Sequence, residues 1–350
     1  AAAERADFAN DQLSRGWDAS GNTGGGTILV GGDYQGMNLD IQNAQRAYVG
    51  PGASIRADAT REGNGGKVVV WADGDTRYYG SISARGGESA GDGGLVEVSG
   101  KQYLDFHGRV DVSAPNGTGG NVLLDPQDIV LNTTTQPAPP NNAIGTPDVA
   151  FADPPAVGTY TIQIADVTGY SELFLQATNN ITVSNALTMG AGNTIRFEAD
   201  NNITINAAVT TSGTPSTARP SITLTADADA SGAGTLAVNA ALNSDIGGIT
   251  LSGASVTSTA AGTINSTGGV AQNGGDVTIN ATGIVNLAGA ITATGGAAGG
   301  GIGRNGGTVS ITGVGVTTAA ITANGTAGAA GFAGGAGGAI QLDSSNGVTS

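Results

Sequence analysis

The sequence Ile222-Thr223-Leu224 returns 27 residues later as Ile249-Thr250-Leu251, and Ile195-Arg196-Phe197 precedes it by the same distance. The apolar–polar–apolar triplet then recurs after 28, 32 and 31 residues, at Val277-Thr278-Ile279, Val309-Ser310-Ile311 and Ile340-Gln341-Leu342. Such alternation is typical of a short strand with one buried face. A period this short cannot form a domain and fits one coil of a solenoid. The repeat predicts an all-β fold, a right-handed parallel β-helix.

The N-terminal half carries a related repeat, in which a glycine precedes each apolar strand. Its members start 40, 28 and 26 residues apart and are Gly26–Val30, Gly66–Val70, Gly94–Val98 and Gly120–Leu124. The long first spacing predicts an insertion between Asp33 and Ala47. Alternation along these strands predicts one inward ladder of apolar side chains, at Ile28, Val68, Val96 and Val122. The intervening side chains, Leu29, Val69, Glu97 and Leu123, are expected on the outer face.

Asparagines add a second kind of ladder. Asn179-Asn180-Ile181-Thr182-Val183 and Asn201-Asn202-Ile203-Thr204-Ile205 match closely and lie 22 residues apart. Side-chain amides stacked in this way can hydrogen-bond along a β ladder. We expect these asparagines to stabilise a coil corner.

The repeat is interrupted in the middle of the chain, where seven of the eleven prolines fall between residues 126 and 155. Proline cannot donate a hydrogen bond to an interior ladder, so this segment is expected to form an extra-helical loop or a boundary. The predicted organisation is a terminal extension or partial coil (1–16), a first set of coils (17–132), a Pro-rich insertion (133–169) and a second set of coils (170–350), which stops inside the repeat.

Composition excludes several classes of site. The 350 residues include no cysteine, one histidine and 61 glycines, and the net charge is −15. Thiol chemistry and clustered histidine ligands are therefore impossible, and only His107 could serve a Ser-His-Asp triad. The negative charge disfavours nucleic-acid binding. No run of 18 apolar residues occurs, so no membrane insertion is expected. We predict neither a cofactor nor a metal site, and no enzymatic activity.

Carboxylate pairs are the remaining candidates for catalysis or calcium binding. They are Asp73/Asp75, Glu88/Asp92, Asp125/Asp128 and Asp227/Asp229. Paired carboxylates can cleave glycosidic bonds or bind calcium. Each pair nevertheless falls in a turn-like stretch, where aspartate is favoured by its local backbone hydrogen bonds. The structural interpretation is preferred, and calcium binding stays open.

Three aromatic residues form the candidate ligand site. Alternation places Trp71 on the outer face, and Tyr78 and Tyr79 follow one turn later. An exposed aromatic face of this kind can bind a sugar ring or a protein partner. The alternative is that these side chains pack against a loop or cover the edge of a coil.

Several long motifs resemble large secreted proteins of the filamentous haemagglutinin type. They are Gly25–Gly36, Asn43–Ala53, Gly65–Asp73, Gly94–Lys101 and Leu123-Leu124-Asp125-Pro126. The resemblance is specific over residues 17–132, whereas residues 170–350 resemble the family in repeat style alone. The family's N-terminal secretion domain, with its Asn-Pro motifs, is not visible, so the chain is interpreted as an interior or processed segment.

The resemblance implies an extracellular protein on the bacterial outer cell surface, exported by an outer-membrane transporter in two-partner secretion. It further implies an adhesin or biofilm-matrix protein that binds host or matrix glycans or proteins. Two alternatives remain. The open ends of a β-helix can add end to end, which would make the chain a subunit of an extracellular filament. A β-helical polysaccharide-degrading enzyme is the second.

Overall fold

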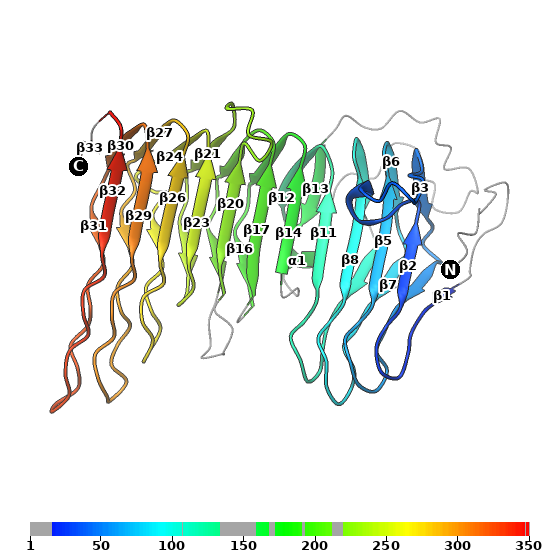
Figure 1. Ribbon diagram of the computed structural model, residues 1–350, viewed down its shortest axis with the longest axis horizontal. Helices are drawn as coiled ribbons and strands as arrows, with labels where there is room; N and C mark the ends of the chain where they lie inside the picture. The colour runs from blue at the N-terminus through cyan, green and yellow to red at the C-terminus, as the bar shows by residue number, and fades with distance from the viewer. Residues whose placement is uncertain are drawn as a thin grey trace. The chain divides into compact units, whose positions relative to one another are not determined.

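The computed structural model describes residues 16–106, 108–133, 159–167, 172–190, 193–211, 220–346 and 348–349. Its strands are short and pair in parallel with the equivalent strands of the next coil (Figure 1). The fold is therefore the all-β parallel β-helix expected from the repeat. Contacts divide the chain into two compact units, one of residues 1–129 and 134–166, the other of residues 130–133 and 167–350.

The strands of the first unit belong to three parallel sheets, in which their orders are β1-β4-β7-β10, β2-β5-β8-β11 and β3-β6-β9. The strands of the first sheet are β1 (Gly16–Asp18), β4 (Ser54–Arg56), β7 (Ser81–Ser83) and β10 (Arg109–Asp111). Those of the second are β2 (Thr27–Val30), β5 (Lys67–Ala72), β8 (Leu95–Gly100) and β11 (Asn121–Asp125). Those of the third are β3 (Arg46–Val49), β6 (Asp75–Tyr78) and β9 (Tyr103–Phe106).

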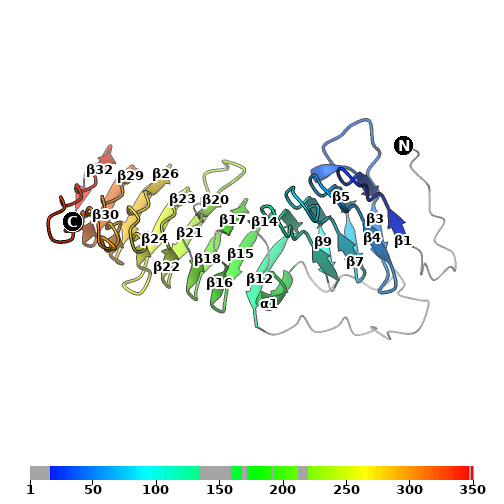
Figure 2. The same cartoon turned by 90° about the horizontal axis from the view of Figure 1, so that it is seen from below.

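The strands of the second unit also belong to three parallel sheets. One is formed by β14 (Glu172–Ala177), β17 (Thr194–Ala199), β20 (Ile222–Ala226), β23 (Ile249–Gly253), β26 (Val277–Ala281), β29 (Val309–Gly313) and β32 (Ile340–Ser344). The next is formed by β15 (Asn180–Val183), β18 (Ile203–Ile205), β21 (Thr235–Val238), β24 (Ser255–Ser258), β27 (Ile284–Leu287), β30 (Gly315–Thr318) and β33 (Val348–Thr349). The last is formed by β16 (Leu187–Met189), β19 (Val209–Thr211), β22 (Leu242–Ser244), β25 (Ile264–Asn265), β28 (Ile291–Thr292) and β31 (Ile321–Thr322). Figure 2 shows β18, β21 and β24 on a different side of the coil from β20, β23 and β26.

The register confirms the ladders predicted from alternation. Ile28 pairs with Val68, Val68 with Val96 and Val96 with Val122. Val68, Val96 and Val122 are completely buried. In the second unit Ile222 pairs with Ile249, and both are completely buried as well. A narrow core of Val, Ile, Leu and Ala therefore fills each coil, and the side chains between them point outward.

Two segments depart from the regular coil. The expected insertion is a long connection between β2 and β3 that contains the short helix η1 (Tyr34–Gly36). Three further elements, β12 (Asp128–Asn132), β13 (Thr159–Gln163) and α1 (Ile164–Val167), lie near or inside the predicted Pro-rich insertion. The prolines from 137 to 155 lie outside the described residues, so their loop is not described. In the described part of the chain, no helix has the length and apolar character needed to cross a membrane.

Candidate functional site

The connection between β2 and β3, residues 31–45, is called here the β2–β3 connection. It leaves the coil after Val30 and packs against the outer face of β5 (Figure 1). Gly36 allows this close approach, because it has a left-handed φ of 63° and a Cβ there would lie 2.7 Å from atoms of the Trp71 ring. Gln35 also has a left-handed backbone, with φ of 54°. Such a conformation is unfavourable for a side-chain-bearing residue, so the surrounding contacts must stabilise it.

Asp33 fixes the start of the connection. Its carboxylate accepts hydrogen bonds from the Lys67 ammonium at 2.5 Å and from the Asn38 amide at 2.9 Å. The Tyr34 N–H adds a third bond at 2.7 Å. The Asn38 amide, the Lys67 ammonium and the Tyr34 N–H lower the pKa of Asp33 to about 2. A carboxylate with these three donors stays ionised at physiological pH and ties the connection to β5.

Asn43 fixes the other end. Its amide nitrogen donates to the Gly36 carbonyl at 3.0 Å and to Asp73 Oδ1 at 3.0 Å. Trp71 Nε1 donates to the same Asp73 oxygen at 3.2 Å. The indole therefore lies under the connection and is 4 % exposed. These contacts and those of Asp33 join the two ends of the connection to β5 and to Asp73, the residue that follows it.

Glu97 lies beneath the connection and is completely buried. It occupies the outer face of β8, in register with Val69 on one side and Leu123 on the other. The Gln35 N–H points at its carboxylate, at 3.2 Å from Oε1 and 3.0 Å from Oε2. Burial raises the pKa of Glu97 to about 7, and the hydrogen bond from the Gln35 N–H only partly opposes that rise. A titratable group is therefore enclosed between the sheet and the connection.

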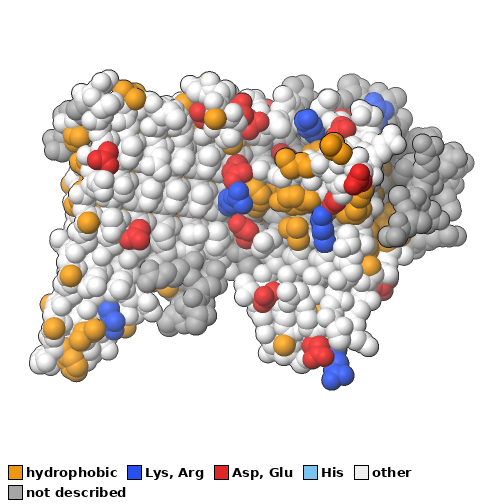
Figure 3. Space-filling view, viewed as in Figure 1, with side chains coloured by type: hydrophobic (Ala, Val, Ile, Leu, Met, Phe, Trp, Pro, Cys, Tyr) orange, Lys and Arg blue, Asp and Glu red, His pale blue; other side chains and the backbone are white. Residues whose placement is uncertain are grey.

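The tip of the connection has the opposite character. Met37 is 74 % exposed and Leu39 is 99 % exposed, although the neighbouring residues Gly36 and Asn38 are held by hydrogen bonds. Figure 3 shows hydrophobic side chains gathered on this face of the first unit, bordered by charged ones. Exposed apolar side chains on a fixed loop are suited to contact with a partner surface.

Two of the three residues predicted to form an exposed aromatic face, Trp71 and Tyr78, are buried. Trp71 lies under the connection, and Tyr78 is completely buried, with its ring stacked on Phe106 at 5.2 Å. Tyr79 is half-buried and donates from its hydroxyl to Asp105 Oδ2 at 2.5 Å. Alternation assigned Trp71 to the outer face correctly, but the outer face at that point is covered. For Trp71, the structure agrees with the alternative that it packs against a loop.

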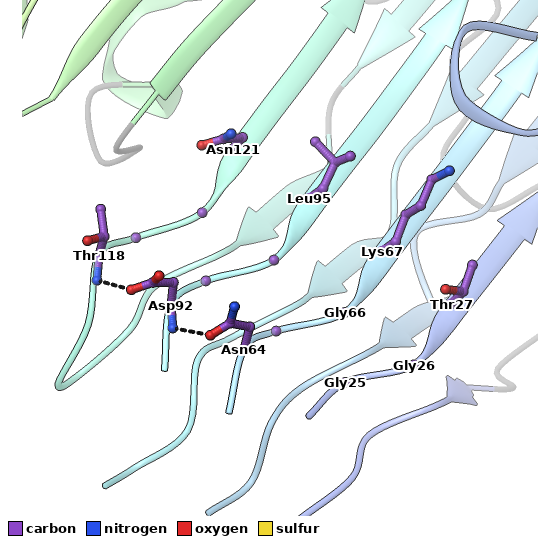
Figure 4. A pocket seen from close by; sticks show the side chains of 15 residues that line it. Gly25, Gly26, Thr27, Asn64, Gly66, Lys67, Asp92, Leu95, Thr118 and Asn121 are labelled. Atoms are coloured by element: carbon purple, nitrogen blue, oxygen red, sulfur yellow. Dashed lines mark hydrogen bonds between the residues drawn. The ribbon is translucent and has the colours of Figure 1, made fainter. Parts of the chain in front are cut away.

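A shallow groove of about 630 Å³ follows the corner of the coils in the first unit (Figure 4). Glycine pairs line it, because a Cβ on Gly66 or Gly94 would lie 2.0 Å from a carbonyl of the preceding coil. Beside them, the Asp92 N–H donates to Asn64 Oδ1 at 2.9 Å, and the Thr118 N–H donates to Asp92 Oδ1 at 2.8 Å. The groove therefore results from close stacking of the corner, and its polar groups stabilise the stack.

Where the structure describes their contacts, the aspartates of the carboxylate pairs accept hydrogen bonds within turns or from neighbouring segments of the fold. Asp227 accepts from the Ser231 hydroxyl and from the N–H groups of Gly232 and Ala233. Asp92 belongs to the corner ladder, and Asp73 holds Trp71 and Asn43. Among the described residues, no three acidic or histidine side chains are close enough to hold a metal ion. His107 lies outside the described residues.

Glu97, Gln35, Met37 and Leu39 were not predicted as functional residues. One signal for Glu97 is present in the sequence, because it is a charged residue between Leu29, Val69 and Leu123 at an otherwise apolar position of the repeat. The 40-residue spacing marked the insertion that covers it. No sequence pattern showed that the insertion folds back over this strand.

Comparison with protein-family models gave no match, and comparison with curated protein sequences gave none either. The site must therefore be interpreted from its own geometry.

Proposed function

We propose that the chain is part of a secreted bacterial surface adhesin, and that the β2–β3 connection is a contact surface for its partner. The β-helix acts as a rigid support for this loop. The resemblance to filamentous haemagglutinin-type proteins supports export by an outer-membrane transporter and a place on the cell surface. Matrix or host proteins and glycans are the proposed partners.

The observation that carries this proposal is the combination of fixed ends and an exposed apolar tip. Asp33 and Asn43 hold the connection to β5, while Met37 and Leu39 are 74 % and 99 % exposed. Because the loop is already ordered, binding through its tip loses little conformational entropy. Burying two apolar side chains contributes about 3 kcal/mol or more to an interface.

Binding of the purified chain to panels of immobilised matrix proteins and glycans tests the proposal. We expect the double variant Met37→Gln, Leu39→Gln to bind at least about tenfold more weakly. The matched control is Val270→Gln, since Val270 is an exposed apolar residue of the second unit, 70 % exposed. Equal binding by the double variant and the unchanged chain would contradict the proposal. Circular dichroism checks that each variant keeps its β-sheet content.

A further inference from the structure

Glu97 is the one feature of this site that a simple contact surface does not require. Its side chain is completely buried, and it stands between Val69 and Leu123 where an apolar residue would fill the same position. Burying a carboxylate is unfavourable unless it is paired or protonated. Packing alone therefore does not explain a glutamate at position 97.

The charged groups around Glu97 do not compensate for an ionised carboxylate. Lys67 of β5 acts on Glu97 from one side, but its ammonium forms an ion pair with Asp33 of the connection. Asp125 of β11 acts from the other side with a like charge. The Gln35 N–H, which belongs to the connection itself, donates to the carboxylate. The connection both supplies a donor to Glu97 and excludes water from it.

We propose that the β2–β3 connection is a proton-controlled latch, which stays closed on the sheet while Glu97 is protonated and opens when Glu97 loses its proton. Closing the latch buries Glu97, and opening it exposes the side chain to water. By linkage, the state that favours the protonated form is stabilised at low pH. An open latch moves Met37 and Leu39 from their fixed positions. The consequence for binding rests on the proposed function, whereas the latch itself does not.

The size of the effect follows from the difference between the two states. The pKa of Glu97 is about 7 in the closed structure, against an ordinary value of 4.5 in water. Between pH 5.5 and pH 8 the equilibrium for opening should therefore rise roughly 25-fold. Below that range the latch is closed most firmly. Asp33, with its low pKa, stays ionised throughout and does not contribute to the change.

Cysteine labelling measures this opening directly, because the chain contains no native cysteine. Val69→Cys places a thiol on the outer face of β5, next to Glu97 in register, at a completely buried position. Ser89→Cys, in an exposed loop, gives the reference rate that corrects for the ionisation of the thiol. Val70→Cys, completely buried in the core of the same strand, reports unfolding of the whole coil.

We expect the corrected labelling rate of Val69→Cys to rise roughly 25-fold from pH 5.5 to pH 8 and to exceed that of Val70→Cys. In a Glu97→Gln background the corrected rate should not change with pH. The latch is overturned by a flat rate in the chain with Glu97, by an equal rise in the Glu97→Gln background, or by equal labelling at positions 69 and 70.

Tryptophan fluorescence provides a second measurement that needs no change at Glu97. The chain has two tryptophans, Trp17 and Trp71, and Trp17→Phe leaves only the indole beneath the connection. We expect its emission to lie at longer wavelength at pH 8 than at pH 5.5, and an unchanged emission would count against the latch. Neither measurement uses a ligand. A pH-dependent opening in a chain that binds no partner would support the latch and contradict the proposed function. Partner binding by a chain that shows no pH-dependent opening would support the proposed function and contradict the latch.

Discussion

At the scale of single residues, the corner glycines are the most tightly constrained positions. A Cβ on Gly66 would lie 2.0 Å from the Gly26 carbonyl oxygen, and one on Gly94 would lie 2.0 Å from the Gly66 oxygen. Each clash involves the backbone of a neighbouring coil, which cannot move without disturbing the stack. The high glycine content is therefore explained in part by close approach at the corners.

Replacing Gly66 by alanine should lower the free energy of unfolding by about 2–3 kcal/mol, because the added methyl group has no space. Gly52→Ala is the matched control, since a Cβ there meets nothing within 4 Å. Urea unfolding monitored by circular dichroism measures both variants. Similar losses of stability in the two variants would show that corner packing is not the cause.

Glu97 predicts a distinct dependence of stability on pH. Its pKa is raised to about 7 in the folded chain, so the protonated form favours the folded state. This contribution is fully present below the ordinary pKa of 4.5 and is lost as pH rises through about 7. Its full size is at most about 3 kcal/mol. Urea unfolding at pH 5.5 and pH 8 should show lower stability at pH 8, and Glu97→Gln should remove that difference.

At the scale of structural elements, amide ladders join the coils of the second unit. Asn202 Nδ2 donates to Asn180 Oδ1 at 3.0 Å, and Asn202 Oδ1 accepts from the Thr235 N–H at 2.9 Å. Asn201 and Asn179 form a parallel contact at 3.2 Å. Each amide thus connects one strand start to the next, which confirms the ladder predicted from the 22-residue match.

Removal of one member of this ladder should destabilise the second unit. Asn202→Ala removes the acceptor of the Thr235 N–H and the side-chain donor to Asn180 Oδ1, which keeps its bond from the Asn202 backbone N–H. The loss should cost about 1–2 kcal/mol. Asn286→Ala is the control, because Asn286 is an exposed residue that points outward from β27. Urea unfolding should show little change for the control, and equal effects of the two substitutions would contradict the ladder's role.

At the scale of the whole molecule, charge is distributed unevenly along the chain. Ten of the thirteen basic residues precede position 110, and the net charge is −15. Mutual repulsion between acidic groups keeps such a protein in solution at neutral pH. The carboxylates of the second unit have few basic partners in its sequence, which contains only Arg196, Arg219 and Arg304.

We expect solubility to be lowest near pH 4, close to the isoelectric point of about 4.1, because the net charge and its repulsion vanish there. Light scattering across a pH series measures the effect. Added salt at pH 7 should increase scattering, because it screens the repulsion between the acidic groups. A solubility minimum at neutral pH would contradict this view of the surface. The latch experiments begin at pH 5.5 for this reason.

The sequence by itself determined the parallel coils, their register and the asparagine ladder, because a stacked β-helix repeats the same local choice of apolar, polar and glycine residues in every coil. It also located the insertion after β2, from the long spacing between Gly26 and Gly66. Only the tertiary structure decided what the insertion covers. Outward pointing and exposure are different properties, since a strand's alternation sets direction while a segment packed on the outer face sets access to water. For that reason Trp71 and Glu97 are buried, while Met37 and Leu39 of the connection are exposed.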